Sequence, residues 1–270
     1  MKKYELLKDD TKIMSGHTLY RIKALRDFGN VEKGDLGGYI ESEDNLSHNG
    51  DAWVFDDARV FGNARVCGNA MVCGNAEVCG NARVFGNAMV CGNAEVFDDA
   101  EVCGNAMVCG NAEVCGNAEV CGNARVCGNA EVCGNARVFG NARVCGNAMV
   151  CGNARVFGNA RVFGNAMVFG NAEVFDDAEV CGNARVCGNA MVCGNAEVKS
   201  EDDYIVFKNN WSSGRCFTYT KSNKMWKVGC FYGTGQELIE KAYADSELSG
   251  KCYEAYVKLV EQLEEIQEVE

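Results

Sequence analysis

The chain has 270 residues, 47% of them apolar, with 18 cysteines, no proline and a net charge of −12. This length and composition can bury a sizeable core, which excludes a disordered tail, a collagen-like fibre and a small disulfide knot. The acidic charge argues against nucleic-acid binding, because that affinity comes from Lys and Arg displacing counterions. Since no apolar run reaches the ~18 residues of a membrane span, we expect a cytoplasmic protein with free thiols.

Residues 1–51 precede a long internal repeat and are polar in composition. We expect them to form a β-containing cap over the first turn of the repeat, because a solenoid needs polar terminal units that stop open-ended stacking. His48 falls six residues before the first repeat valine. We expect it to occupy a core-side position with a structural role.

Residues 52–199 form the repeat, in which valine recurs every six residues, 25 times from Val54 to Val198. Each unit reads Ala-x-Val-[Cys/Phe]-Gly-Asn, where x varies. Period-two alternation puts Ala and Val on one face of a strand, and Gly-Asn supplies a corner that tolerates positive φ. Three corners are Asp-Asp instead, beginning at Asp56, Asp98 and Asp176. Because aspartate tolerates the same conformation, we interpret them as alternative corners rather than metal sites.

The variable x residues indicate how many units close one turn. An x residue matches the one three units later in 12 of 22 comparisons, against 6 of 24 for the adjacent unit. The resulting superperiod of 18 residues predicts a mainly β fold, a triangular parallel β-helix with three short strands per turn. The 25 units give about eight turns, with a core of stacked Val and Ala.

The repeat resembles that of the hexapeptide-repeat proteins. The segments LYRIKALRDF at 19–28, GDLGGYI at 34–40 and NLS at 45–47 are similar to the opening of an uncharacterised bacterial and prophage group of these proteins. The resemblance covers about residues 17–198. It implies a left-handed β-helix and a homotrimer, and it implies no particular activity.

Hexapeptide-repeat proteins include acyltransferases and carbonic anhydrase-like metalloenzymes, and this sequence departs from both. The acyltransferases use a histidine base and usually a loop extruded from the coil, whereas the 25 units contain neither a histidine nor an insertion. The two histidines of the chain, His17 and His48, are too few for the three zinc ligands of the second class. We expect no enzyme activity, metal or cofactor; a divergent acyltransferase that works between protomers is an alternative.

Fifteen cysteines occupy the repeat position that otherwise holds phenylalanine, apart from a terminal lysine. A position that accepts thiol or phenyl indicates apolar stacking rather than metal ligation. We expect consecutive turns to stack Cys73, Cys91, Cys109, Cys127 and Cys145.

The x residues point outward and differ between the three faces of the predicted rod. Face 1 starts at Trp53, face 2 at Arg59 and face 3 at Arg65, and each continues with every eighteenth residue. Like charges on adjacent strands are destabilising, so the arginines of face 1 and the glutamates of face 2 favour neutralisation by a partner; recent duplication with solvent screening is the alternative. The apolar residues on face 1 and on the last helix predict an interface between protomers at Met71, Met89, Met107, Tyr256, Val260 and Leu263.

Residues 200–270 differ in composition and predict a small α+β module. The pattern predicts strands at 204–207, 215–220 and 225–231, a helix opened by a capping box at 234–237, and a second helix from about 249 to 267. Hydroxyls, an arginine, an aromatic ring and a helix N-terminus suit an anionic ligand. The candidate ligand site is Trp211, Ser212, Ser213, Arg215 and Thr234; the alternative is a hairpin turn and an ordinary helix cap.

The sequence therefore predicts a non-catalytic scaffold, a rigid solenoid that oligomerises and presents a C-terminal module to an anionic small molecule or a protein partner. The second hypothesis is a protein that binds or sequesters an anionic nucleotide. A rod that mimics DNA is a further hypothesis, weakened by nine arginines that balance nine glutamates at the x positions.

Overall fold

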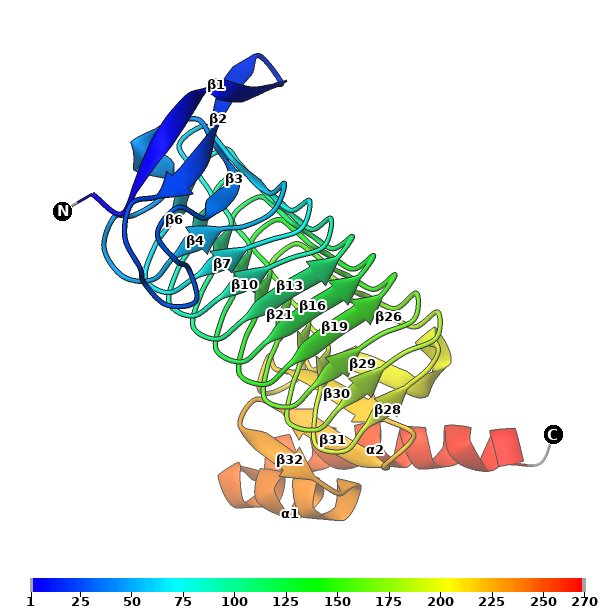
Figure 1. Ribbon diagram of the computed structural model, residues 1–270. Helices are drawn as coiled ribbons and strands as arrows, with labels where there is room; N and C mark the ends of the chain where they lie inside the picture. Colours follow the sequence, from blue (N-terminus) through cyan, green and yellow to red (C-terminus); the bar gives the residue numbers. More distant parts are fainter. Residues whose placement is uncertain (1, 269–270) are drawn as a thin grey trace.

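The structure, a computed structural model, describes residues 2–268 and has three parts: an N-terminal β hairpin, a long solenoid and a C-terminal module. Figure 1 shows the hairpin and the module at opposite ends of the solenoid. The N-terminal part contains β1 (Tyr4–Met14), β2 (His17–Ala24), β3 (Leu36–Ile40) and one turn of 3-10 helix (Glu43–Asn45).

Each face of the solenoid is a parallel sheet in which every strand pairs with the strands 18 residues before and after it. This register confirms the predicted parallel β-helix with three strands per turn. The strands of face 1 are β4 (Trp53–Val54), β7 (Met71–Val72), β10 (Met89–Val90), β13 (Met107–Gly110), β16 (Arg125–Gly128), β19 (Arg143–Gly146), β22 (Arg161–Val162), β25 (Glu179–Val180) and β28 (Glu197–Val198).

Face 2 continues the sheet of the N-terminal hairpin, whereas face 3 is a separate sheet. The strands of face 2 are β5 (Arg59–Val60), β8 (Glu77–Val78), β11 (Glu95–Val96), β14 (Glu113–Val114), β17 (Glu131–Val132), β20 (Met149–Val150), β23 (Met167–Val168) and β26 (Arg185–Val186). The strands of face 3 are β6 (Arg65–Val66), β9 (Arg83–Val84), β12 (Glu101–Val102), β15 (Glu119–Val120), β18 (Arg137–Val138), β21 (Arg155–Val156), β24 (Glu173–Val174) and β27 (Met191–Val192).

Stacked alanine and valine side chains fill the interior of the solenoid. All repeat alanines and valines from Ala52 to Val198 are buried, which confirms the inward assignment. Nine strands stack on face 1, and the solenoid has about nine turns, one more than the repeat alone predicts. The additional turn comes from the segment before the repeat, because β3 pairs with β5 and Leu46 forms a bridge with Val66.

The corners use residues that accept positive φ. At Gly110, where φ is 79°, an added Cβ would lie 2.8 Å from the carbonyl oxygen of Gly128 in the next turn. Asp56, Asp98 and Asp176 also have positive φ, between 52° and 59°, which confirms that they form corners. Each of these aspartates accepts a hydrogen bond at Oδ2 from the backbone N–H of the glycine 18 residues later. The carboxylate thus satisfies a donor in the next corner.

The N-terminal segment supplies donors to the first repeat turn. Within the solenoid, each repeat alanine carbonyl accepts a backbone hydrogen bond from the preceding turn. At the first turn, Lys3 Nζ donates to the carbonyl of Ala52 at 2.7 Å, and Asn45 Nδ2 donates to that of Ala64 at 2.9 Å. The Lys3 side chain is buried, and this burial lowers its pKa to about 8.

His48 lies outside the core, so its predicted core-side position is wrong. Leu46 pairs with a residue 20 positions later and Trp53 with one 18 positions later, so the corner between them holds two additional residues. Leu46 therefore fills the core. His48 instead stacks on the Tyr4 ring, with ring centroids 4.4 Å apart, and its Nδ1 accepts a hydrogen bond from the backbone N–H of Lys3.

The C-terminal module supplies the acceptors that the last turn requires. Thr218 Oγ1 accepts a hydrogen bond from the backbone N–H of Met191 at 2.9 Å. Ser222 Oγ accepts one from the backbone N–H of Glu197 at 2.8 Å. In earlier turns, the equivalent N–H groups bond to a carbonyl of the following turn. Two hydroxyl groups therefore replace the next turn and end the stack.

The C-terminal module is α+β, as predicted, with an antiparallel sheet and two helices packed around the buried side chains of Phe217, Trp226 and Leu238. The expected third strand is interrupted at Gly229, where φ is 56°, and forms two strands. No helix among residues 2–268 is long and apolar enough to cross a membrane. The elements are a 3-10 turn (Glu201–Asp203), β29 (Tyr204–Lys208), β30 (Cys216–Thr220), β31 (Met225–Val228), β32 (Phe231–Gly233), α1 (Gly235–Asp245) and α2 (Glu247–Glu268).

Candidate functional site

The two serines of the predicted ligand site belong to a tight turn after β29. The buried side chain of Asn209 organises this turn, because its Nδ2 donates to Ser212 Oγ at 2.8 Å and to Ser213 Oγ at 3.3 Å. Its Oδ1 accepts the backbone N–H groups of Trp211 and Ser212. Both hydroxyls therefore have partners within the turn, and Trp211 projects into solvent with 77% of its surface exposed.

Thr234 lies at the N-terminus of α1 and forms the predicted capping box with Glu237. Thr234 Oγ1 accepts the backbone N–H of Glu237, and Glu237 Oε2 accepts the backbone N–H of Thr234 at 2.8 Å. Hydrogen bonds from Thr234 lower the pKa of the Glu237 carboxyl. The Thr234 side chain is thus engaged in helix capping.

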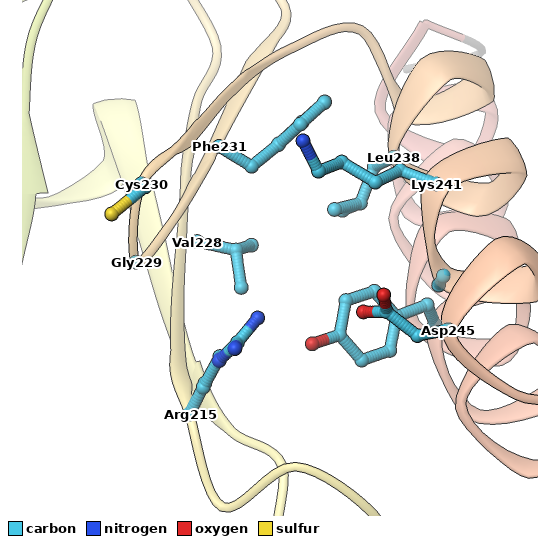
Figure 2. A pocket seen from close by; sticks show the side chains of 10 residues that line it. Arg215, Val228, Gly229, Cys230, Phe231, Leu238, Lys241 and Asp245 are labelled. Carbon is cyan, nitrogen blue, oxygen red and sulfur yellow. The ribbon is translucent and has the colours of Figure 1, made fainter.

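Arg215 lies apart from the other predicted residues and lines a cavity of about 380 Å³, which we call the module cavity. Its walls come from the start of β30, the turn between β31 and β32, and one face of α1. Figure 2 shows the Arg215 side chain directed into the cavity from the strand side, and Lys241 and Asp245 reaching in from the helix. Val228 and Leu238 contribute apolar surface.

Trp211 borders a different hollow, the Trp211 groove, with Tyr256 and Leu259 of α2. The structure therefore distributes the five predicted ligand residues over a turn, a helix cap, the module cavity and the Trp211 groove. It brings Arg215 together with Lys241, Asp245 and Phe231, which the sequence analysis did not select. Their separation along the chain leaves no local motif that identifies them.

The methionines predicted at an interface form a continuous ladder on face 1. Met71, Met89 and Met107 occupy the same register on adjacent strands and are half-buried. The predicted helix residues differ in exposure. Val260 lies in the core of the module, Tyr256 packs against the ring of Phe207, and Leu263 is 43% exposed. The available surface therefore includes Leu263 but excludes the buried Val260 side chain.

Face 3 pairs its charges internally. Arg83 forms an ion pair with Glu101 at 2.9 Å, Arg137 pairs with Glu119 and Arg155 pairs with Glu173, in each case between adjacent turns. Like charges in neighbouring strands repel, and this alternation of sign removes most of the repulsion.

Faces 1 and 2 carry runs of like charge instead. Arg125, Arg143 and Arg161 stack on face 1, and only Arg161 has an ion-pair partner among residues 2–268, at Glu179. Face 2 stacks glutamates in four consecutive turns, of which only the first pairs with an arginine among the described residues. The glutamates are Glu77, Glu95, Glu113 and Glu131.

The repeat cysteines form columns of free thiols between the turns. Cys109, Cys127 and Cys145 occupy matching positions in consecutive turns, as expected. All 18 cysteines are free, and no cluster of metal-ligating side chains is present within residues 2–268. Burial raises the pKa of these three column thiols above the ordinary value of 9.0.

Four stretches of the solenoid match the protein family described as YdcK Beta solenoid repeat: residues 64–80, 76–92, 130–146 and 142–156. The chain is a repeat β-solenoid protein. No curated protein matches the chain significantly. The family match supports the repeat architecture, and the description concerns a structural repeat rather than an activity.

Proposed function

We propose that this protein is a non-catalytic cytoplasmic scaffold whose rigid solenoid associates side by side with copies of itself and presents the C-terminal module at one end. The distribution of charge over the faces carries this proposal. Face 3 pairs its charges internally, whereas faces 1 and 2 present unpaired arginines and glutamates, respectively. Complementary potentials on two surfaces favour their association and fix their orientation.

The order of side chains along faces 1 and 2 also favours parallel packing at equal height. A residue of face 1 and the residue six positions later on face 2 belong to the same solenoid turn. Packing these levels together brings no like charges into contact. The paired levels are Trp53/Arg59, Met71/Glu77, Met89/Glu95, Met107/Glu113, Arg125/Glu131, Arg143/Met149, Arg161/Met167 and Glu179/Arg185.

An interface between two different faces is heterologous and can close into a ring. Faces 1 and 2 are adjacent faces of a triangular rod, so we infer a closed ring of three copies. The methionine ladder of face 1 supplies half-buried apolar surface that adapts readily to a partner. Face 3 then points away from the ring axis, where its internal ion pairs suit exposure to solvent.

The contacts of the two histidines support a non-catalytic role. His17 Nδ1 lies 2.9 Å from Glu41, and His48 stacks on Tyr4 within the N-terminal segment. Both side chains therefore contribute to closing the first end of the solenoid. The exposed Trp211 groove lies at the other end and gives the module an apolar surface for a protein partner.

Native mass spectrometry and sedimentation velocity of the full-length protein test the assembly. We expect a trimer for the natural sequence. Arg125→Glu should weaken association at least tenfold, because it places a glutamate opposite Glu131, and like-charge juxtaposition in an interface costs several kcal/mol. Combining Arg125→Glu with Glu131→Arg should restore the trimer.

A matched control exchanges charges on the outward face. Arg83→Glu with Glu101→Arg keeps an internal ion pair on face 3 and should leave the mass unchanged. A natural protein that is monomeric at every concentration contradicts the proposed assembly. Failure of Glu131→Arg to rescue Arg125→Glu contradicts the pairing of face 1 with face 2.

A further inference from the structure

The module cavity has the size and lining of a small-molecule site. Its volume of about 380 Å³ lies within the ~300–1,000 Å³ range of ligand pockets. At the lower end of that range, it accommodates one ring with a small substituent rather than an oligonucleotide. The side chains of Val228, Leu238 and Ala242 are almost completely buried and line it with apolar surface. This lining suits the hydrocarbon part of a ligand.

Two cations approach the cavity from opposite walls, as Figure 2 shows for Arg215 and Lys241. Neither forms an ion pair within residues 2–268, although other basic residues of the module do so, including Lys224, Lys251 and Lys258. Lys241 Nζ lies 6.0 Å from the centroid of the Phe231 ring. Arginine and lysine donors of this kind bind carboxylate and phosphate groups through charge-assisted hydrogen bonds.

The remaining polar groups define the orientation of such a ligand. The Tyr253 hydroxyl already donates to Ser213 Oγ at 3.1 Å, so its proton is engaged. Asp245 also lines the cavity, at the C-terminal end of α1. Its carboxylate repels an anion, and the acidic group of the ligand is therefore favoured between Arg215 and Lys241, away from Asp245.

We propose that the module cavity binds a small organic anion, in which a carboxylate or phosphate lies between Arg215 and Lys241 and a single apolar ring contacts Val228 and Leu238. This site differs from the predicted cluster around Trp211, from which it retains only Arg215. It does not depend on self-association of the solenoid, because every residue that lines it belongs to one C-terminal module.

Calorimetric titration of the full-length protein with phenyl phosphate and benzoate tests the proposal. Phenol reports the contribution of the ring alone, and inorganic phosphate reports that of the charge alone. We expect at least one of the two ring-bearing anions to bind at least about tenfold more tightly than both phenol and inorganic phosphate, because it satisfies the cations and the apolar wall together. Equal affinity for phenol overturns the role of the cations.

Substitutions then locate the site. Arg215→Gln and Lys241→Gln should each weaken binding about tenfold, whereas Asp245→Asn should strengthen it by removing a repulsive charge. Lys251→Gln, in the Trp211 groove, is the matched control and should leave affinity unchanged. Thermal unfolding without ligand checks that each variant folds. Undiminished binding to the Arg215→Gln/Lys241→Gln protein, or no binding of either ring-bearing anion to the natural protein, overturns the proposal.

Discussion

Alkaline pH should destabilise the solenoid through its columns of buried thiols. Burial raises the pKa of Cys79 to about 11 and that of Cys133 and Cys193 to about 12, from the ordinary value of 9.0. In the unfolded chain these thiols ionise near their ordinary value, so above that pH the unfolded state has released more protons than the folded state. The stabilising contribution is complete below pH 9 and is lost as the pH rises towards the folded-state values.

At pH 10, each of these three thiols lowers the free energy of unfolding by about 1.4 kcal/mol, or about 4 kcal/mol together. This is a large fraction of the ~5–15 kcal/mol that stabilises an ordinary domain. Lys3 acts in the opposite direction, because its pKa is lowered to about 8 and its charged form is disfavoured by burial. Its loss of a proton between pH 8 and 10.5 raises stability by at most roughly 3 kcal/mol.

Guanidinium unfolding followed by circular dichroism in reducing buffer, between pH 7 and pH 10, measures this dependence. The Lys3 contribution cancels when the natural protein is compared with a variant that carries Cys79→Ala, Cys133→Ala and Cys193→Ala. That variant should lose about 4 kcal/mol less than the natural protein on going to pH 10. Equal losses in the two proteins refute the assignment to these thiols. A control variant replaces three cysteines outside the repeat: Cys216, Cys230 and Cys252.

Three further substitutions test the interior, the terminal hydrogen bonds and the corners. Val126→Asp buries an unpaired carboxylate and should lower the free energy of unfolding by about 3–5 kcal/mol in chemical denaturation, whereas an unchanged value contradicts the inward position of valine. Thr218→Val with Ser222→Ala removes two acceptors from the last turn, and hydrogen exchange of the two exposed donors should accelerate while central turns stay protected. Asp98→Ala removes the acceptor for Gly116 and keeps a positive φ, so thermal unfolding should show a loss of about 1–3 kcal/mol.

The sequence determines the solenoid well because each interaction in it is repeated. Valine and alanine alternate with outward residues at a fixed interval, and the 18-residue recurrence of the x residues specifies which strands pair. The terminal hydrogen bonds were not predicted, because Thr218 and Ser222 act once each and on residues more than 20 positions away.

The candidate site was only partly predictable for the same reason. Ser212 and Ser213 are neighbours of Arg215 in sequence, but the buried amide of Asn209 uses their hydroxyls to form a turn. Arg215 instead faces Lys241, which belongs to a helix that follows three strands later. A linear motif records proximity along the chain, and it contains no information on which side chains a turn has already engaged.

The closure of the solenoid at both ends restricts how its length can change. Each end is completed by residues specific to one face: Lys3 and Asn45 at the start, Thr218 and Ser222 at the finish. Loss of a single six-residue unit moves the final hydroxyls to the wrong face, whereas loss of 18 residues, such as 103–120, returns every donor to its acceptor. The rod can therefore shorten or lengthen in steps of one strand spacing, ~4.8 Å, with both ends intact. Replication errors in such a gene are tolerated when they preserve this interval, so the distance between the two ends can evolve as a discrete quantity.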